Sequence, residues 1–255
     1  IYSEWAPNEK VAVEAAIGAS MGGVRSFAAM KMVGLNVAAD PMFTFAYQGI
    51  NGGMAFVNAD DPGMHSSQNE QDNRRYAKAM KICMLEPADS QECLDMTRAA
   101  YEISEKYESP VMIRLTTRVD HSKSLVELGE RKEVPAVPYV KQRDRLDDVP
   151  AVSKQRRYVI EEREKQLKEY SENSPFNYEE MHDTKIGIVA SGVAYMYAKE
   201  VLGDKASYLK IGFSYPLPIE KIRAFSKKVD TLYVVEELDP VMEEQIKAAG
   251  IDCHG

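Results

Sequence analysis

The chain has 255 residues, with 40 acidic and 32 basic side chains that give a net charge of −8, and 44 % of its residues are apolar. This length predicts one or two domains that can each close a hydrophobic core, and the apolar content excludes intrinsic disorder. The negative charge argues against a nucleic-acid-binding protein. No apolar run approaches the roughly 20 residues that span a bilayer, so we expect no membrane insertion.

The three cysteines, Cys83, Cys93 and Cys253, are far apart in the sequence and form no Cys-x-x-Cys pair. They predict neither a disulfide framework nor a four-ligand metal site, and their roles stay open. A reducing, cytoplasmic location is the expectation. Because the sequence begins at Ile1 and ends soon after a strand-like run, we expect a fragment of a longer protein.

The first 118 residues alternate helix-like and strand-like stretches, which is typical of α/β layering with buried parallel strands. Asn8 can cap a helix over residues 9–21, whose apolar positions recur at helical spacing. The other expected elements, in chain order, are a strand at 26–32, a helix starting at 41–47, strands at 53–58 and 82–85, a helix at 90–107 and a strand at 111–115.

The segment over residues 127–183 differs in composition, because it holds 14 acidic and 11 basic residues and four prolines. Residues 151–172 favour a long polar helix. Because acidic and basic residues are mixed along the segment, it indicates a solvated connection rather than a surface for charge recognition. We therefore predict a charged, partly helical linker.

From Lys185 the alternation returns, which predicts a second, smaller unit with right-handed crossovers. The expected fold class is thus α/β, with two mainly parallel-sheet units over residues 1–126 and 184–255 joined by the linker. The elements expected in the second unit are strands at 186–190, 206–211 and 231–235 and helices at 193–202, 219–226 and 240–249.

Two polar segments are candidates for a site, since the sequence has no phosphate-binding Gly-rich loop, nucleophile elbow or zinc-protease motif. In the first, Glu9 begins the first helix, where the helix dipole favours a carboxylate and simple capping is the alternative. The second is the loop Asp60–Arg75, which follows a buried strand. Ligands of α/β proteins bind at the carboxyl ends of parallel strands, although an exposed loop with no site is equally compatible with the pattern.

A third candidate is Thr116–His121, directly after the strand at 111–115. Arg118 could hold a carboxylate through its fork of donors, and His121 could relay a proton. An ordinary ion pair between Arg118 and Asp120 is the simpler interpretation.

Four blocks in this order resemble the alpha subunits of indolepyruvate ferredoxin oxidoreductases: Glu4–Glu14, Gly34–Pro41, Ala59–Asp72 and Leu115–Ser124. These subunits belong to the thiamine diphosphate-dependent 2-oxoacid:ferredoxin oxidoreductases, which oxidatively decarboxylate a 2-oxoacid to an acyl-coenzyme A and pass electrons to ferredoxin. The resemblance implies that residues 1–126 form a pyrimidine-binding domain lacking its amino-terminal part. It implies that residues 184–255 form a domain similar to the transketolase C-terminal domain.

By this resemblance, Glu9 is the catalytic and cofactor-binding glutamate that hydrogen-bonds N1′ of the cofactor's aminopyrimidine. An acid there favours the imino tautomer, which is needed to remove the thiazolium C2 proton. Glu4 and Glu14 are the alternatives if the match is displaced along the chain.

For the 2-oxoacid, the resemblance leaves several candidates. His65 is a candidate proton donor, and Arg74, Arg75 and Arg118 are candidate clamps for the substrate carboxylate. The aryl group of indolepyruvate requires an apolar pocket, and the candidates for its lining are Phe43, Phe45, Tyr47 and Met64.

The resemblance implies thiamine diphosphate with Mg²⁺, whose diphosphate site lies outside this chain, and iron–sulfur clusters in a part of the full-length protein not included here. The implied partners are the protein's own diphosphate-binding domain, a second subunit, ferredoxin, coenzyme A and a second copy in a dimer. A relative acting on pyruvate or 2-oxoglutarate stays open, as does a non-catalytic dimerisation or interaction module.

Overall fold

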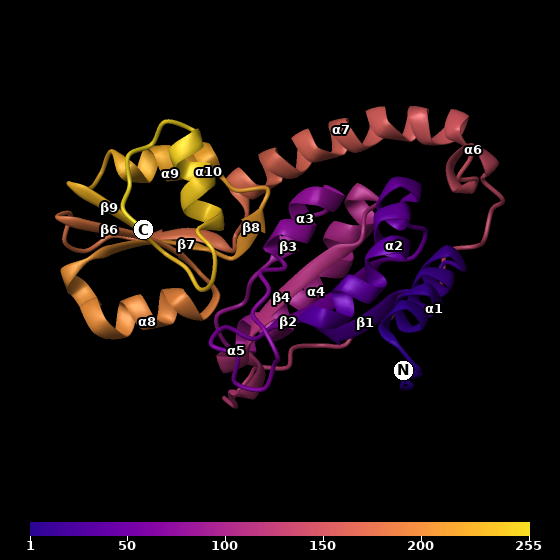
Figure 1. The fold of residues 1–255 in the computed structure, drawn as a ribbon, viewed down its shortest axis with the longest axis horizontal. Coiled ribbons are helices and arrows are strands. Elements are labelled where there is room, and N and C mark those ends of the chain that lie inside the picture. Colours follow the sequence, from indigo (N-terminus) through magenta and orange to yellow (C-terminus); the bar gives the residue numbers. More distant parts are fainter.

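A computed structural model describes all residues from 1 to 255 as two α/β units that lie side by side, with one long helix that runs along the N-terminal unit and ends at the C-terminal unit (Figure 1). The N-terminal unit is built on a five-stranded sheet and the C-terminal unit on a four-stranded sheet. No helix has both the length and the apolar composition needed to cross a membrane.

The sheet of the N-terminal unit has the strand order β1-β2-β4-β3-β8, in which the first four strands are parallel. Its fifth strand, β8, comes from the second half of the chain and pairs antiparallel with β3. The bounds are Ser26–Lys31 for β1, Met54–Asp60 for β2, Met84–Leu85 for β3, Val111–Thr116 for β4 and Phe213–Tyr215 for β8.

Helices cover both faces of this sheet. The first core lies between the sheet and α1, α2 and α3, and the second lies between the sheet, α4 and α7. Asn8 and Asp89 cap α1 and α4 by accepting hydrogen bonds from Val11 N and Glu92 N, at 3.1 and 2.9 Å. The helices are α1 (Glu9–Met21), α2 (Met32–Gln48), α3 (Arg74–Met80) and α4 (Ser90–Tyr107).

An extended segment over residues 122–142 joins the short helix α5 (Thr117–His121) to α6 (Arg143–Leu146). It crosses the outer side of α4, where Arg98 Nη2 donates to Leu128 O at 2.9 Å. The long helix α7 (Pro150–Asn173) then runs back toward the C-terminal unit (Figure 1).

The sheet of the C-terminal unit has the order β5-β7-β6-β9, with β5 antiparallel to three parallel strands. Helices α9 and α10 cover one face and α8 covers the other. The bounds are Asn177–Glu180 for β5, Ile186–Ser191 for β6, Ser207–Ile211 for β7, Thr231–Val235 for β9, Gly192–Leu202 for α8, Gly203–Lys205 for a 3₁₀ turn, Ile219–Ser226 for α9 and Val241–Ala248 for α10.

The predicted α/β class with mainly parallel sheets is confirmed, and the helix at 90–107 has the predicted bounds. The expectation of a helix starting near Pro41 is wrong, since Pro41 lies inside α2, which begins at Met32. The predicted linker of 127–183 also differs from the structure. Its last residues form β5, because an edge strand needs only one neighbour and can be short and polar.

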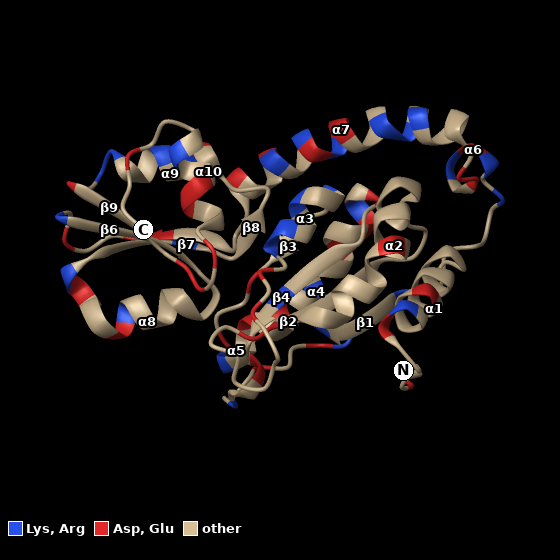
Figure 2. Ribbon diagram, in the orientation of Figure 1, with Lys and Arg blue, Asp and Glu red and all other residues tan.

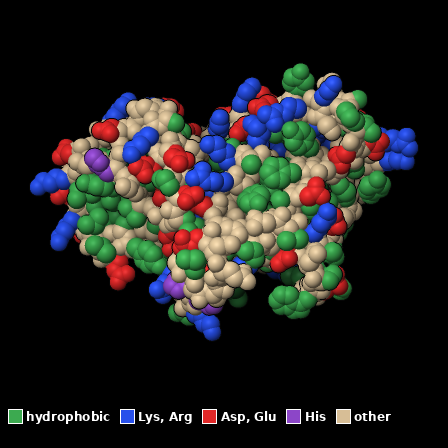
Figure 3. Space-filling model, viewed as in Figure 1, with side chains coloured by type: hydrophobic (Ala, Val, Ile, Leu, Met, Phe, Trp, Pro, Cys, Tyr) green, Lys and Arg blue, Asp and Glu red, His purple; other side chains and the backbone are tan.

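The helix α7 is more than a solvated connection. Lys and Arg positions are mixed with Asp and Glu positions along the ribbon of α7 (Figure 2), and Lys and Arg side chains gather along the upper edge of the molecule (Figure 3). Its inner stripe is buried: Arg156, Ile160, Arg163, Leu167 and Ser171. Arg156 Nε donates to Tyr47 O and Arg163 Nη2 to Ala46 O, both at 2.8 Å, so these arginines bind the carbonyls that end α2.

Candidate functional site

The polar segments singled out in the sequence meet at one edge of the N-terminal sheet. Each of β1, β2 and β4 ends there, and the helices α2 and α5 and the loop after β2 begin there. The helix α1 precedes β1 and runs antiparallel to it, so its first residue, Glu9, lies at this edge as well (Figure 1). This carboxyl edge of parallel strands is where α/β proteins bind ligands.

Glu9 lies half-buried against the start of α2, where Gly34 leaves room for it. A Cβ at Gly34 would lie 2.5 Å from Glu9 Cγ and 2.9 Å from both Cδ and Oε1. The carboxylate has no hydrogen-bond or ion-pair partner in the chain, whereas the cap of α1 is supplied by Asn8. Glu9 is therefore a half-buried carboxylate whose oxygens are free to accept hydrogen bonds from a ligand.

The two alternatives to Glu9 have different surroundings. Glu4 lies in the exposed N-terminal segment and accepts a hydrogen bond from Tyr2 Oη at 2.6 Å. Glu14 is exposed on α1, 4.0 Å from Lys10 Nζ. Neither has the half-buried position against α2 that Glu9 has.

Asp61 organises the loop that follows β2. Its carboxylate accepts hydrogen bonds from His65 N at 3.1 Å, Ser66 N at 2.9 Å, and the hydroxyls of Ser67 and Thr117, both at 2.6 Å. The hydroxyl bonds, together with the two backbone bonds, hold the pKa of Asp61 well below its usual range. Through Thr117, Asp61 joins the His65 loop to the turn that carries Arg118.

His65 and Arg118 are exposed at this edge. His65 Nε2 lies 3.5 Å from the place that a Cβ at Gly63 would take. The expected ion pair between Arg118 and Asp120 is absent, and Arg118 has no acidic partner in the chain. Its guanidinium donors are therefore open to an anionic ligand.

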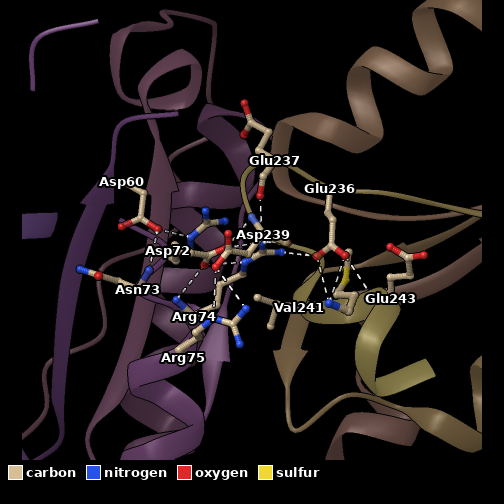
Figure 4. A network of polar contacts seen from close by, with 12 residues as sticks. Asp60, Asp72, Asn73, Arg74, Arg75, Glu236, Glu237, Asp239, Val241 and Glu243 are labelled. Atoms are coloured by element: carbon tan, nitrogen blue, oxygen red, sulfur yellow. Dashed lines mark hydrogen bonds and ion pairs between the residues drawn. The ribbon is translucent and has the colours of Figure 1, made fainter. Parts of the chain in front are cut away.

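Arg74 has a different environment from the one expected. Its side chain is 1 % exposed, and it donates to Asp72, to Glu236 and to the carbonyls of Glu237 and Asp239 (Figure 4). Each guanidinium nitrogen donates to a group of the protein and the side chain is buried, so Arg74 is not accessible to a substrate. Arg75 is exposed, and its side chain pairs with Asp239 at 3.1 Å and Glu244 at 3.6 Å.

Arg114, in the middle of β4, is a buried residue of this edge that the sequence analysis missed. Nε donates to Asp60 at 2.6 Å and Nη1 to Glu86 at 2.5 Å, and the side chain is 4 % exposed. Burial alone would lower the pKa of Arg114, but the adjacent carboxylates raise it. A charged residue inside an apolar strand was the available sequence signal.

The candidates for an aryl pocket are separated by the fold. Phe45 is 1 % exposed in the core, and Phe43 and Tyr47 share the last turns of α2, which ends at the opposite edge of the sheet from Glu9. Met64 is exposed in the same loop as His65. Of the four, Met64 alone lies at the candidate site.

Comparison with known proteins identifies the family. Residues 5–187 match the family described as pyruvate flavodoxin/ferredoxin oxidoreductase, thiamine diphosphate-binding. The chain belongs to this family. The resemblance seen in the sequence is therefore confirmed, and the family's cofactor is thiamine diphosphate.

Curated relatives named indolepyruvate oxidoreductase subunit IorA are 44 % identical over 99 % of the chain in Pyrococcus abyssi and 41 % identical over 98 % in Archaeoglobus fulgidus. The chain spans 41 % of the length of each. A solved 2-oxoglutarate:ferredoxin oxidoreductase from Magnetococcus marinus shares the fold, with a TM-score of 0.74 and 16 % identity over 98 % of this chain and 52 % of that one. A split-gene transketolase also shares the fold, with a TM-score of 0.57 and 16 % identity over 94 % of this chain and 67 % of that one.

The residues at the carboxyl edge fit the family's cofactor. An aminopyrimidine needs a carboxyl group that is withdrawn from bulk water and not already bonded within the protein. Glu9 meets both conditions, since it is half-buried and has no partner in the chain.

Proposed function

We propose that the chain is the pyrimidine-binding part of a larger 2-oxoacid:ferredoxin oxidoreductase that acts on arylpyruvates such as indolepyruvate. The reaction would be oxidative decarboxylation with coenzyme A to an aryl-acyl-coenzyme A, with the electrons passed to ferredoxin. The IorA relatives and the thiamine diphosphate-binding family support this function. The observation that carries it is the free, half-buried carboxylate of Glu9 at the ligand-binding edge of the sheet.

Thiamine diphosphate, when bound, supplies the electron sink that decarboxylation of a 2-oxoacid requires. Glu9 holds the proton at N1′ of its aminopyrimidine, and Gly34 leaves the space in which the Glu9 side chain lies. The helix α1 fixes Glu9 in its first turn, with the N-cap already supplied by Asn8. Glu9 thus serves proton transfer rather than helix capping.

Arg118 binds the substrate carboxylate in this proposal, because its donors have no acidic partner in the chain. His65 is the proton donor, since Asp61 fixes the backbone of its loop beside the Arg118 turn. Arg74 and Arg75 instead contact the C-terminal unit. Met64, next to His65, would contact the aryl group.

The larger protein would supply the remaining parts of the cytoplasmic enzyme. These are the diphosphate and Mg²⁺ site, the iron–sulfur clusters, a second subunit, and the binding of ferredoxin and coenzyme A, with a dimer as the expected assembly. The length of the IorA relatives, of which the chain spans 41 %, supports a larger protein.

Exchange of the cofactor's C2 proton for deuterium in the complete enzyme tests the role of Glu9. Glu9→Gln should slow this exchange by about 10² to 10⁴-fold, the range of acid–base catalysis. Glu14→Gln, on the same helix but exposed, is the matched control. Wild-type exchange in a folded Glu9→Gln enzyme would overturn the assignment, and slow exchange in Glu14→Gln would transfer it to Glu14.

A second candidate is a related enzyme for an aliphatic 2-oxoacid. Relatives named ketoisovalerate oxidoreductase subunit VorB and 2-oxoglutarate synthase subunit KorA are 24 % and 25 % identical to the chain. Comparing kcat/KM of the complete enzyme for indolepyruvate, 2-oxoisovalerate and 2-oxoglutarate separates the candidates. A non-catalytic module predicts no turnover of any of them.

A further inference from the structure

The loop over residues 61–72, which carries Met64 and His65, is held at its start by the N-terminal unit alone and at its end by both units. We name it the site loop. At its start, Asp61 binds the loop's own backbone and Thr117 of the N-terminal unit. At its end, the adjacent Asn73 donates to Met32 O of the N-terminal unit at 2.8 Å, and Asp72 accepts a hydrogen bond from Asp239 N of the C-terminal unit at 3.1 Å. The C-terminal unit thus holds this end together with the N-terminal unit.

The contact at the end of the site loop is buried and centred on Arg74. Figure 4 shows its side chain between Asp72 and the turn that joins β9 to α10. Nη1 donates to Glu236 at 2.5 Å, and Nη2 donates to Asp72 at 2.5 Å and to the carbonyls of Glu237 and Asp239 at 2.8 and 2.7 Å. We name these contacts of Asp72, Arg74 and Glu236 the latch.

The latch is also part of the C-terminal unit's own structure. Glu236 accepts hydrogen bonds from Met242 N at 2.9 Å and Glu243 N at 3.0 Å, which are amides of the first turn of α10. The helix end therefore fixes the carboxylate that binds Arg74. The C-terminal unit therefore contacts Asp72 in two ways, through the guanidinium of Arg74 and directly through Asp239 N.

Between its two ends the site loop has few contacts with other elements. Lys31 Nζ donates to Ser66 O at 2.9 Å, and Asn36 Nδ2 donates to Gln71 Oε1 at 2.7 Å. Its residues from Gly63 to Ser66 are exposed. A loop with few buried contacts depends on its anchored ends for its conformation.

We propose that Arg74 is a positioning residue, through which the C-terminal unit holds the site loop in the conformation that presents His65 to the substrate. The C-terminal unit then contributes to substrate binding without touching the substrate. This inference rests on the proposed function, because it assigns a purpose to the geometry of His65.

The test compares two Glu→Gln variants in the complete enzyme. Glu236→Gln removes the charge that binds buried Arg74, whereas Glu244→Gln removes the exposed partner of Arg75 on α10. We expect Glu236→Gln to raise KM for indolepyruvate about tenfold with a smaller change in kcat, since a displaced loop weakens substrate positioning. Glu244→Gln should leave both unchanged.

Amide hydrogen exchange of the same proteins without substrate gives a readout that is independent of turnover. In Glu236→Gln, exchange should accelerate over residues 62–71 and stay unchanged in β2 and β4. If Glu236→Gln does not fold, Arg74→Lys, which keeps the charge but loses the fork, replaces it in both measurements. Unchanged KM and unchanged exchange in the folded variant would overturn the inference. A wild-type enzyme that turns over no 2-oxoacid would instead refute the proposed function.

Discussion

The molecule buries two pairs of arginines that donate to different kinds of acceptor. At the candidate site, Arg74 and Arg114 bind carboxylates, those of Asp72, Glu236, Asp60 and Glu86. Under α7, Arg156 and Arg163 bind no carboxylate and donate to backbone carbonyls at the ends of helices.

The pKa values reflect this difference. Flanking carboxylates raise the pKa of Arg114, whereas burial and the neighbouring Arg156 lower the pKa of Arg163 to about 10. The contrast indicates that each buried charge at the site edge depends on a charged partner, whereas carbonyls at helix ends hold α7. The stability of the Arg–carboxylate contacts depends on pH and on the presence of each partner. The contacts of Arg156 and Arg163 with carbonyls depend mainly on hydrogen bonding.

The largest expected effect is a difference in the free energy of unfolding between variants of the two arginine pairs. Arg114→Met leaves the carboxylates of Asp60 and Glu86 buried without a counterion, which should lower the free energy of unfolding by about 3–5 kcal/mol. Arg163→Met removes two hydrogen bonds but leaves no buried charge, so we expect a loss of about 1 kcal/mol. Urea denaturation measures both, and equal losses would contradict the contrast.

The pH dependence of stability should follow the carboxylates. The folded-state pKa of Asp61 is lowered by its hydrogen bonds, so its contribution is complete above the unfolded pKa of about 4 and is lost as the pH falls below it. Asp61→Asn should therefore flatten the decline of stability below about pH 4. Arg163→Met should keep the wild-type dependence of stability on pH. Thermal unfolding across pH 3–7 measures both variants, and an unchanged decline in Asp61→Asn or an altered one in Arg163→Met would contradict these expectations.

Glu9 is a third case, because it is a half-buried carboxylate with no partner in the chain. Gly34→Ala tests whether the space beside Gly34 is needed to position the Glu9 side chain. Alanine favours a helix over glycine by about 0.5–1 kcal/mol. The three atoms nearest to the added Cβ all belong to the Glu9 side chain, which must take another rotamer. We expect equal or higher stability together with slower C2-proton exchange of the cofactor, by about tenfold. Gly18→Ala on α1, with nothing within 4 Å of the added Cβ, is the control and should leave exchange unchanged.

The smallest effect is expected at the exposed contact beside the latch. The side chain of Arg75 is 52 % exposed, and surface ion pairs contribute about 0–1 kcal/mol. Arg75→Gln should change the free energy of unfolding by less than about 1 kcal/mol and leave KM for indolepyruvate unchanged. A larger loss of unfolding free energy would show that the exposed ion pairs of Arg75 contribute to stability together with the buried contacts of Arg74.

The sequence by itself determined the local structure of several elements and named the segments that are candidates for a site. Capping residues and apolar spacing predicted the bounds of α1, α4, α9 and β9, because these signals act within a few residues of the chain. The loop after β2 and the turn with Arg118 each follow a strand, which predicts that both lie at carboxyl ends of strands, whereas the position of Glu9 beside α2 is a finding of the structure.

Only the tertiary structure decided which sheet the edge strands join and which arginines are buried. The short strand β8 follows β7 in sequence yet pairs with β3 in the other unit, and polar β5 completes the C-terminal sheet. Arg74 had the same sequence signal as Arg75, but its partners Glu236 and Asp239 lie more than 160 residues away. Local pattern cannot specify such pairs, because burial and hydrogen bonding between distant segments depend on how the two units pack together.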